Sequence, residues 1–161
     1  MYDGDAELTH VRGLRVPDLL LDLVRAGAWH HPGDAALAQL MPWFADQLDF
    51  LVGVQAMARE SRSLDHLVED DTTAQVFRLA RSSNATSPVQ LPCLDVDQAF
   101  IIAIARHAGD DTAVALDYRA GASNPRVVAS DIWSEPRRHV WRVVAETFPA
   151  FTVAAGMSVN R

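Results

Sequence analysis

The segment from Gly109 to Ile132 constrains the fold of this chain more than any other. Apolar residues alternate with small or charged ones through its first half, which is the two-residue period of a β-strand that buries one face. The alternating apolar positions are Val114, Leu116 and Tyr118. Turn-forming residues follow up to Pro125, and Arg126 then begins a second strand-like run. The segment therefore predicts a strand, a turn and a return strand at the centre of a sheet.

Further strands are predicted on both sides of this segment. The seven apolar residues from Ala99 to Ala105 are rich in isoleucine and indicate a buried strand, although so short a run has no period that separates it from a buried helix. Residues 75–81 and 139–145 also have strand patterns, and Trp141 and Val143 would share one face of the second.

Helices are predicted mainly before the sheet. The first begins near Pro17, which suits a first helical turn, and ends at Gly27, which suits a helix C-terminus. Asp34 can cap a second helix, which would carry Leu37, Leu40 and Met41. Other helical segments are expected at Val54–Arg59, as a short turn at 64–71, and as a short closing helix from about Phe148.

The order of these segments predicts the fold class. Residues 1–12 show no period and are expected to be a loose tail, residues 13–71 to be mainly helical, and residues 72–156 to be mainly sheet with a closing helix. Grouped helices and strands, rather than alternating ones, indicate an α+β fold. We therefore expect a single domain over 1–161, with N-terminal helices, a central antiparallel sheet and a short C-terminal helix.

Composition limits the classes of protein to which the chain can belong. The 49% hydrophobic and 22% charged residues are ordinary for a globular domain. The longest apolar run has seven residues, whereas a membrane span needs roughly 20. The first residues are acidic, so we expect no signal peptide, and the single cysteine, Cys93, suits a cytoplasmic protein.

Charge is distributed unevenly along the chain. All 14 basic residues are arginine, which excludes mechanisms that require lysine, such as Schiff-base formation. Residues 1–80 carry 13 Asp or Glu and 6 Arg, a net charge of −7, whereas residues 81–161 carry eight of each. An acidic half argues against direct binding of nucleic acid and favours a basic protein partner. The alternative is that the acidity serves only solubility.

Five aspartates near the predicted strands are candidates for metal or acid–base chemistry, namely Asp95, Asp97, Asp110, Asp111 and Asp117. Each also has a structural explanation. Asp110 and Asp111 follow Gly109 in a turn, Asp95 can cap a turn, and Asp117 can form an ion pair with Arg119 two residues along the same strand face. A shared metal ion would require these carboxylates to converge on one point.

Other residues give little sign of catalysis. His30 and His31 are adjacent, so they point to different sides and cannot act as a pair of metal ligands. The sequence has no HExxH, GxSxG or glycine-rich phosphate loop, and Cys93 has no activating neighbour, although a Cys–His pair stays a formal alternative. The tryptophans are expected to anchor the core and loops, and they are Trp29, Trp43, Trp133 and Trp141.

Four segments in the C-terminal part of the chain carry a family resemblance, namely 109–119, 125–128, Trp141 with 148–151, and 91–102. They resemble the SUKH superfamily, which includes the yeast Smi/Knr cell-wall-assembly regulators. These are framework positions, so the resemblance implies a fold and a class of role rather than an active site. Family members with an assigned role are binding proteins, and many bacterial ones are inferred to be immunity proteins that neutralise a toxin, often a nuclease.

These observations predict a non-enzymatic protein-binding domain that needs no cofactor. Its partner would be a basic protein, such as a nuclease toxin, bound through an acidic surface that includes Asp65, Glu69, Asp70 and Asp71. The alternatives are a signalling adaptor, a homo-oligomeric scaffold, and a metal-assisted hydrolase that uses the aspartate cluster.

Overall fold

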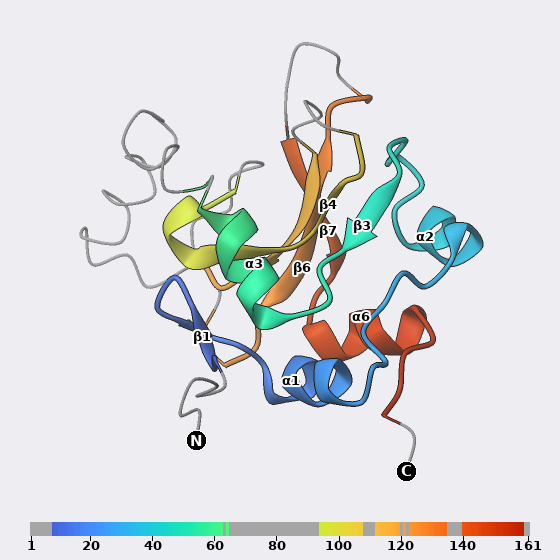
Figure 1. The fold of residues 1–161 in the computed structure, drawn as a ribbon. Coiled ribbons are helices and arrows are strands. Elements are labelled where there is room, and N and C mark those ends of the chain that lie inside the picture. Colours follow the sequence, from blue (N-terminus) through green and yellow to red (C-terminus); the bar gives the residue numbers. More distant parts are fainter. Residues whose placement is uncertain are drawn as a thin grey trace, which may run out of the picture.

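A five-stranded antiparallel sheet forms the centre of the protein in a computed structural model. The structure describes residues 8–62, 64, 94–107, 112–119, 121, 123–134 and 140–159 (Figure 1). The strands are β3 (Leu48–Phe50), β4 (Ala99–Ala105), β5 (Ala113–Asp117), β6 (Arg126–Asp131) and β7 (Val140–Ala145), and they lie side by side in chain order. The α+β fold and the central position of β5 are therefore as predicted.

Burial on both faces explains why β5 is central. Every residue of β5 is buried. Leu116 lies opposite Phe100 of β4 and Val127 of β6, and all three side chains are completely buried. On the other face Ala115 lies opposite Val128 and is equally buried. Small alanines therefore alternate with large apolar residues along this strand, so both of its faces can be packed closely.

Helices α1 (Asp18–Arg25) and α6 (Phe148–Ala154) lie below the sheet in Figure 1. Trp29, which follows α1 in the chain, packs against both α6 and β3. Its ring centroid lies 5.8 Å from that of Phe148 in α6 and 5.2 Å from that of Phe50 in β3. The indole Nε1–H donates a hydrogen bond of 2.9 Å to the carbonyl oxygen of Leu51. Trp29 is thus the core anchor that the sequence predicted.

Helix α3 (Val54–Ser61) packs against β4 and fixes an irregularity in the sheet. The pairing of β4 with β5 shifts register between Ile101 and Ala103. At this shift the backbone N–H of Ile101 donates to the Ser61 hydroxyl at 2.9 Å. The side chain thereby accepts the buried hydrogen bond of a backbone group at the bulge.

Three short strands, β1, β2 and β3, were missed by the sequence analysis. Residues 10–15 form a hairpin of β1 (His10–Val11) and β2 (Leu14–Arg15), where a loose tail to residue 12 was expected. Its turn residues Arg12 and Gly13 both have positive φ, 54° and 79°, as a two-residue hairpin turn requires. The edge strand β3 lies within the segment expected to be mainly helical. Strands of two or three residues are too short to show a period.

The second helix begins differently from the prediction. Helix α2 spans Asp34–Leu40, but Gly33 occupies the N-cap position and no side chain caps the helix. The prediction that Asp34 is the cap is wrong, because the chain turns into the helix at Gly33 with a φ of 104°, a conformation that glycine adopts readily. The other predicted helices within the described residues are confirmed. The strand predicted at 75–81, and the helical turn at 64–71 beyond Leu64, lie outside the described residues.

We expect substitutions on the two faces of β5 to destabilise the protein in two different ways. Replacing Leu116 with Ala should lower the free energy of unfolding by about 2–5 kcal/mol, because it leaves a cavity. Replacing Ala115 with Leu should cost about 1–3 kcal/mol through overpacking. Chemical denaturation would measure both, with Val153→Ala as a control, because Val153 is 79% exposed. A Leu116→Ala variant as stable as the wild type would contradict the central position of β5.

Candidate functional site

Several predicted site residues lie outside the described residues, so the structure does not place them. These are Asp65, Glu69, Asp70, Asp71, Cys93, Asp110 and Asp111. Asp95, Asp97 and Asp117 are described. Among the described residues, no group of three or more His, Cys, Asp or Glu side chains is arranged to hold a metal ion.

Asp117 is committed to a buried ion cluster rather than to a catalytic site. Its Oδ2 lies 2.7 Å from Nε of Arg119 and 2.9 Å from Nη2 of Arg126, and its Oδ1 accepts the backbone N–H of Arg119 at 3.0 Å. The carboxylate is completely buried, and the two guanidinium groups are 4% and 13% exposed. The ion pair with Arg119 is as predicted. Arg126, directly opposite Asp117 across the β5–β6 pair, was missed.

Asp95 and Asp97 lie at a short 3₁₀ turn, η1 (Val96–Gln98), which leads into β4. Asp95 is buried and Asp97 is half-buried. Asp95 occupies the N-cap position and its carbonyl accepts the N–H of Gln98 at 2.9 Å, but its side chain makes no capping hydrogen bond. The backbone of Asp95 therefore closes this turn, and the predicted side-chain cap is wrong.

A second buried carboxylate, Asp131 at the end of β6, was not singled out from the sequence. It accepts hydrogen bonds from Nε of Arg142 and from the backbone N–H groups of Trp133 and Ser134, at 3.0 and 2.9 Å. Burial alone would raise the pKa of Asp131, but these donors together hold it well below its usual range. This carboxylate is therefore kept ionised as a structural acceptor.

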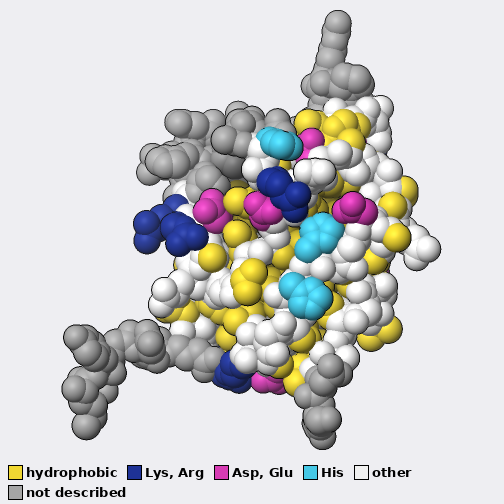
Figure 2. Space-filling model, turned by 45° about the vertical axis from the view of Figure 1, so that its right-hand side comes forward, with side chains coloured by type: hydrophobic (Ala, Val, Ile, Leu, Met, Phe, Trp, Pro, Cys, Tyr) yellow, Lys and Arg dark blue, Asp and Glu magenta, His cyan; other side chains and the backbone are white. Residues whose placement is uncertain are grey.

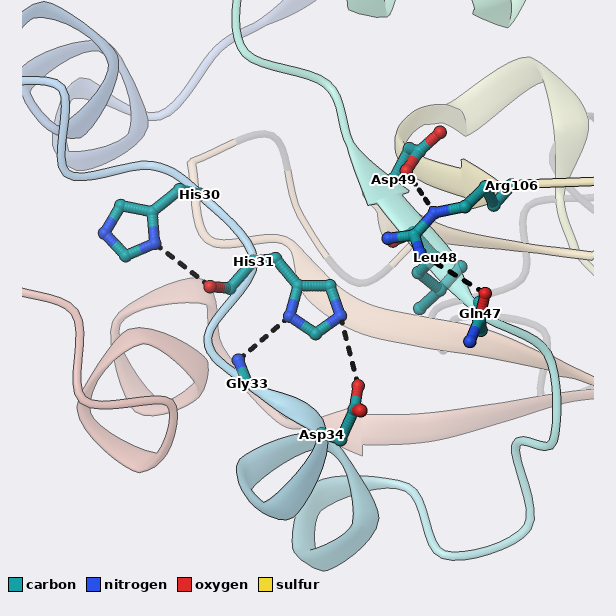
Figure 3. A network of polar contacts seen from close by, with 8 residues as sticks. All are labelled: His30, His31, Gly33, Asp34, Gln47, Leu48, Asp49 and Arg106. Carbon is teal, nitrogen blue, oxygen red and sulfur yellow. Dashed lines mark hydrogen bonds and ion pairs between the residues drawn. The ribbon is translucent and has the colours of Figure 1, made fainter.

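The face along α2 and β3 carries a further polar network (Figures 2 and 3). Its centre is the guanidinium of Arg106, just after β4. Nε donates to Asp49 at 2.9 Å, and the two terminal nitrogens approach the Gln47 side-chain oxygen and the Leu48 carbonyl, each at 3.3 Å. β3 is an edge strand among the described strands. An arginine placed on an edge carbonyl blocks the addition of another strand at that point.

His31 lies just before α2, and its Nδ1 is occupied by a backbone hydrogen bond. Nδ1 accepts the backbone N–H of Gly33 at 2.9 Å, so the proton of the neutral ring is on Nε2, which lies 3.8 Å from Oδ1 of Asp34. The ring also packs edge-on against Phe50 at 5.6 Å. His31 therefore has no free lone pair for a substrate proton or a metal ion. His30 points away from it in Figure 3, as expected for adjacent residues.

A pocket of about 260 Å³ opens beside this network, between α2 and the segment that leads into β3. We call it the α2–β3 pocket. Its lining residues are His31, Asp34, Leu37, Ala38, Met41, Phe44, Ala45, Asp46, Gln47 and Leu48. The lining combines apolar side chains with two carboxylates and contains no arginine. It is therefore the described part of the surface whose chemistry best suits a basic group.

A second pocket, of about 330 Å³, lies between the C-terminal ends of α1 and α6. Both helices end at a glycine with positive φ, Gly27 at 68° and Gly156 at 72°. Its lining has no acidic or arginine side chain, and its one ionisable residue is the exposed His30. This pocket therefore offers fewer recognition groups than the α2–β3 pocket.

The comparisons with known proteins add no relative. No protein-family model, no curated protein and no solved structure matches this chain. Within the described part of the chain, no helix has the length and apolar character needed to cross a membrane.

We expect the buried ion cluster at Asp117 to contribute more to stability than the exposed ion pair of Asp49 with Arg106. Replacing Asp117 with Asn should lower the free energy of unfolding by about 3–5 kcal/mol, because two buried guanidinium groups would lose their counter-charge. The matched variant Asp49→Asn breaks a pair in which both side chains are about half exposed and should cost less than about 1 kcal/mol. Urea unfolding at pH 7 measures both. Equal losses would show that Asp117 does not hold the two arginines.

Asp131 should make stability depend on pH in acid solution. Because its pKa is lowered in the folded state, the stabilisation is fully present above the ordinary aspartate pKa near ~4, and is lost as the pH falls through the folded-state pKa. The difference in unfolding free energy between the wild type and Asp131→Asn should therefore shrink below about pH 4. Denaturation series from pH 7 to pH 2 would test this. A difference that stays constant over that range would contradict it.

Proposed function

We propose that this chain is a non-enzymatic protein-binding domain of the SUKH type, which recognises a basic protein partner. The resemblance suggests that the partner is a nuclease toxin and that the chain is its immunity protein. The single observation that carries the proposal is the α2–β3 pocket, where Asp34 and Asp46 flank apolar side chains and the described lining holds no arginine. A partner with basic side chains would complement this surface.

The disposition of ionisable groups supports a binding role over a catalytic one. Asp117 and Asp131 are buried in contacts with arginine, and Nδ1 of His31 accepts a backbone N–H. General acid–base catalysis needs a group that can exchange a proton with a substrate. A metal-assisted hydrolase built on Asp95, Asp97, Asp110 and Asp111 is the rival hypothesis. Elemental analysis of the purified protein, with thermal melts in the presence and absence of a chelator, would distinguish the two.

The architecture is consistent with the SUKH resemblance. A strand–turn–strand at β5 and β6, followed by β7 with Trp141 and by a closing helix that starts at Phe148, follows the order of the matching segments. The acidic residues proposed from the sequence, Asp65, Glu69, Asp70 and Asp71, lie outside the described residues and stay part of the proposed recognition. We place this activity in the cytoplasm, because a single cysteine suits a reducing compartment.

The proposal predicts a characteristic dependence of binding on salt. The tagged protein would be used to capture its partner from cells, and binding of the identified partner would be measured at about 20 and 300 mM salt. We expect the association rate to fall about tenfold or more over this range, because salt screens the attraction between opposite charges, while dissociation changes less. An adaptor or homo-oligomer with an apolar interface would hold or gain affinity instead.

Charge substitutions provide the second part of this test. Changing Asp65, Glu69, Asp70 and Asp71 to the corresponding amides should slow association with the captured partner. The control is Asp18→Asn with Asp22→Asn, two exposed aspartates on α1. Unchanged association of the fourfold variant would remove these residues from the proposed interface. A partner that is acidic, or that binds independently of salt, would contradict the proposed function.

A further inference from the structure

We infer that the α2–β3 pocket receives one arginine side chain of the partner, with its aliphatic stem on the apolar floor and its guanidinium at the acidic rim. This inference rests on the proposed function and deepens it, because it assigns a position and a chemical group to the recognition. The argument depends on the floor, the rim and the size of the pocket.

The floor of the pocket comes from an incompletely covered helix. Although α2 carries Leu37 and Leu40, none of its seven residues is buried. Met41 and Leu48, by contrast, are only 2% and 1% exposed and close the bottom of the pocket. An amphipathic helix normally buries its apolar face, so the partly exposed side of α2 can gain from a further apolar contact. The methylene groups of a long basic side chain supply such a contact.

The rim of the pocket has uncompensated negative charge. The side chain of Asp34 is 98% exposed, and its only described ion-pair partner is His31, at 3.8 Å. Asp46 is held in place by the Thr112 hydroxyl, which donates to its Oδ2 at 2.6 Å. Arg106, the nearby cation in Figure 3, lies over β3 and is bonded to Asp49 instead. A cation that enters the pocket therefore meets two carboxylates and, in the described part of the lining, no competing arginine.

The size and the aromatic lining favour arginine. At about 260 Å³, the pocket is smaller than the roughly 300–1,000 Å³ of typical small-molecule sites, so it suits a single side chain. The half-buried ring of Phe44 lines it, packed edge-on against Trp133 at 4.9 Å. A guanidinium stacks on aromatic faces, is weakly hydrated and presents five donors to carboxylates. An ammonium group has a more strongly bound hydration shell and loses more on entering an apolar pocket.

The first test uses three small probes and nuclear magnetic resonance. ¹⁵N-labelled protein would be titrated with N-acetyl-arginine methylamide, with the lysine analogue, and with the citrulline analogue, which has the shape of arginine without its charge. We expect saturable shifts at the amides of Leu37, Ala38 and Leu48 with the arginine probe only. Binding of citrulline equal to that of arginine, stronger binding of lysine, or no saturable shift at these amides would overturn the inference.

Two pairs of variants make the test specific to the pocket. Ala38 and Ala35 are both exposed residues of α2, but only Ala38 lines the pocket. Ala38→Phe should abolish probe binding by filling the pocket, and Ala35→Phe should leave it unchanged. Asp34→Asn should weaken binding about threefold. The control Asp22→Asn should have no effect, because Asp22 is an exposed aspartate of α1 that pairs with Arg25, away from the pocket. Equal effects within either pair would overturn the inference.

The same variants separate this inference from the proposed function. If the captured partner associates with the expected salt dependence but Ala38→Phe binds it as tightly as Ala35→Phe, the pocket inference fails and the proposed function stands. If the partner proves to be acidic or insensitive to salt, the proposed function fails, and with it the assignment of the pocket to that partner.

Discussion

The indole of Trp29 is the interaction on which the arrangement of the described elements depends. Its ring contacts Phe50 of β3 and both Phe148 and Phe151 of α6, and its N–H bonds to the carbonyl of Leu51. One side chain thus joins the end of α1, the edge of the sheet and the closing helix, which are far apart in the sequence. It also sets the course of the segment from residue 29 to α2, because Trp29 is fixed in the core while His31 packs on the outer side of Phe50. The position of the α2–β3 pocket follows from this anchor.

Two buried carboxylates stabilise the sheet away from that anchor. Asp117 joins β5 to β6 through Arg126, and Asp131 joins β6 to β7 through Arg142. Each links neighbouring strands through a charge-assisted hydrogen bond, which is stronger than a bond between neutral groups. Around Asp117 both partners are largely excluded from solvent, whereas the Arg142 side chain is 44% exposed. A buried carboxylate without a partner would strongly destabilise the fold, which explains why each of these two side chains is in contact with several donors. Their burial also removes them from any direct role in recognition at the surface.

Much of the sheet could be predicted from the sequence because its strands are long enough to show a pattern. The alternation at Val114, Leu116 and Tyr118 identifies β5 directly, whereas the apolar run Ala99–Ala105 indicates β4 only by its isoleucine content. The pairing of Asp117 with Arg119 follows from two-residue spacing, but its pairing with Arg126 requires the register across the turn, which the sequence does not give. Arg142 meets Asp131 for the same kind of reason: it lies opposite Ala129, two residues before Asp131 in β6. The α2–β3 pocket was missed because its two walls come together only through the turn after α2.

The incomplete burial of α2 connects the fold to the proposed role. Pro42 follows the helix closely and cannot continue it, so the chain leaves α2 after Leu40 and returns toward the sheet. This return brings Asp46 and Leu48 opposite the side of α2 that carries Leu37, and it leaves a gap that no described side chain fills. Leu37 and Leu40 pack against the core, but no residue of α2 is fully buried, so this helix gains less from intramolecular packing than α1 does, whose Leu20 and Leu23 are completely buried. Under the proposed function, a partner's side chain would gain from contact with this partly exposed helix, and the two carboxylates of the pocket would favour a basic one.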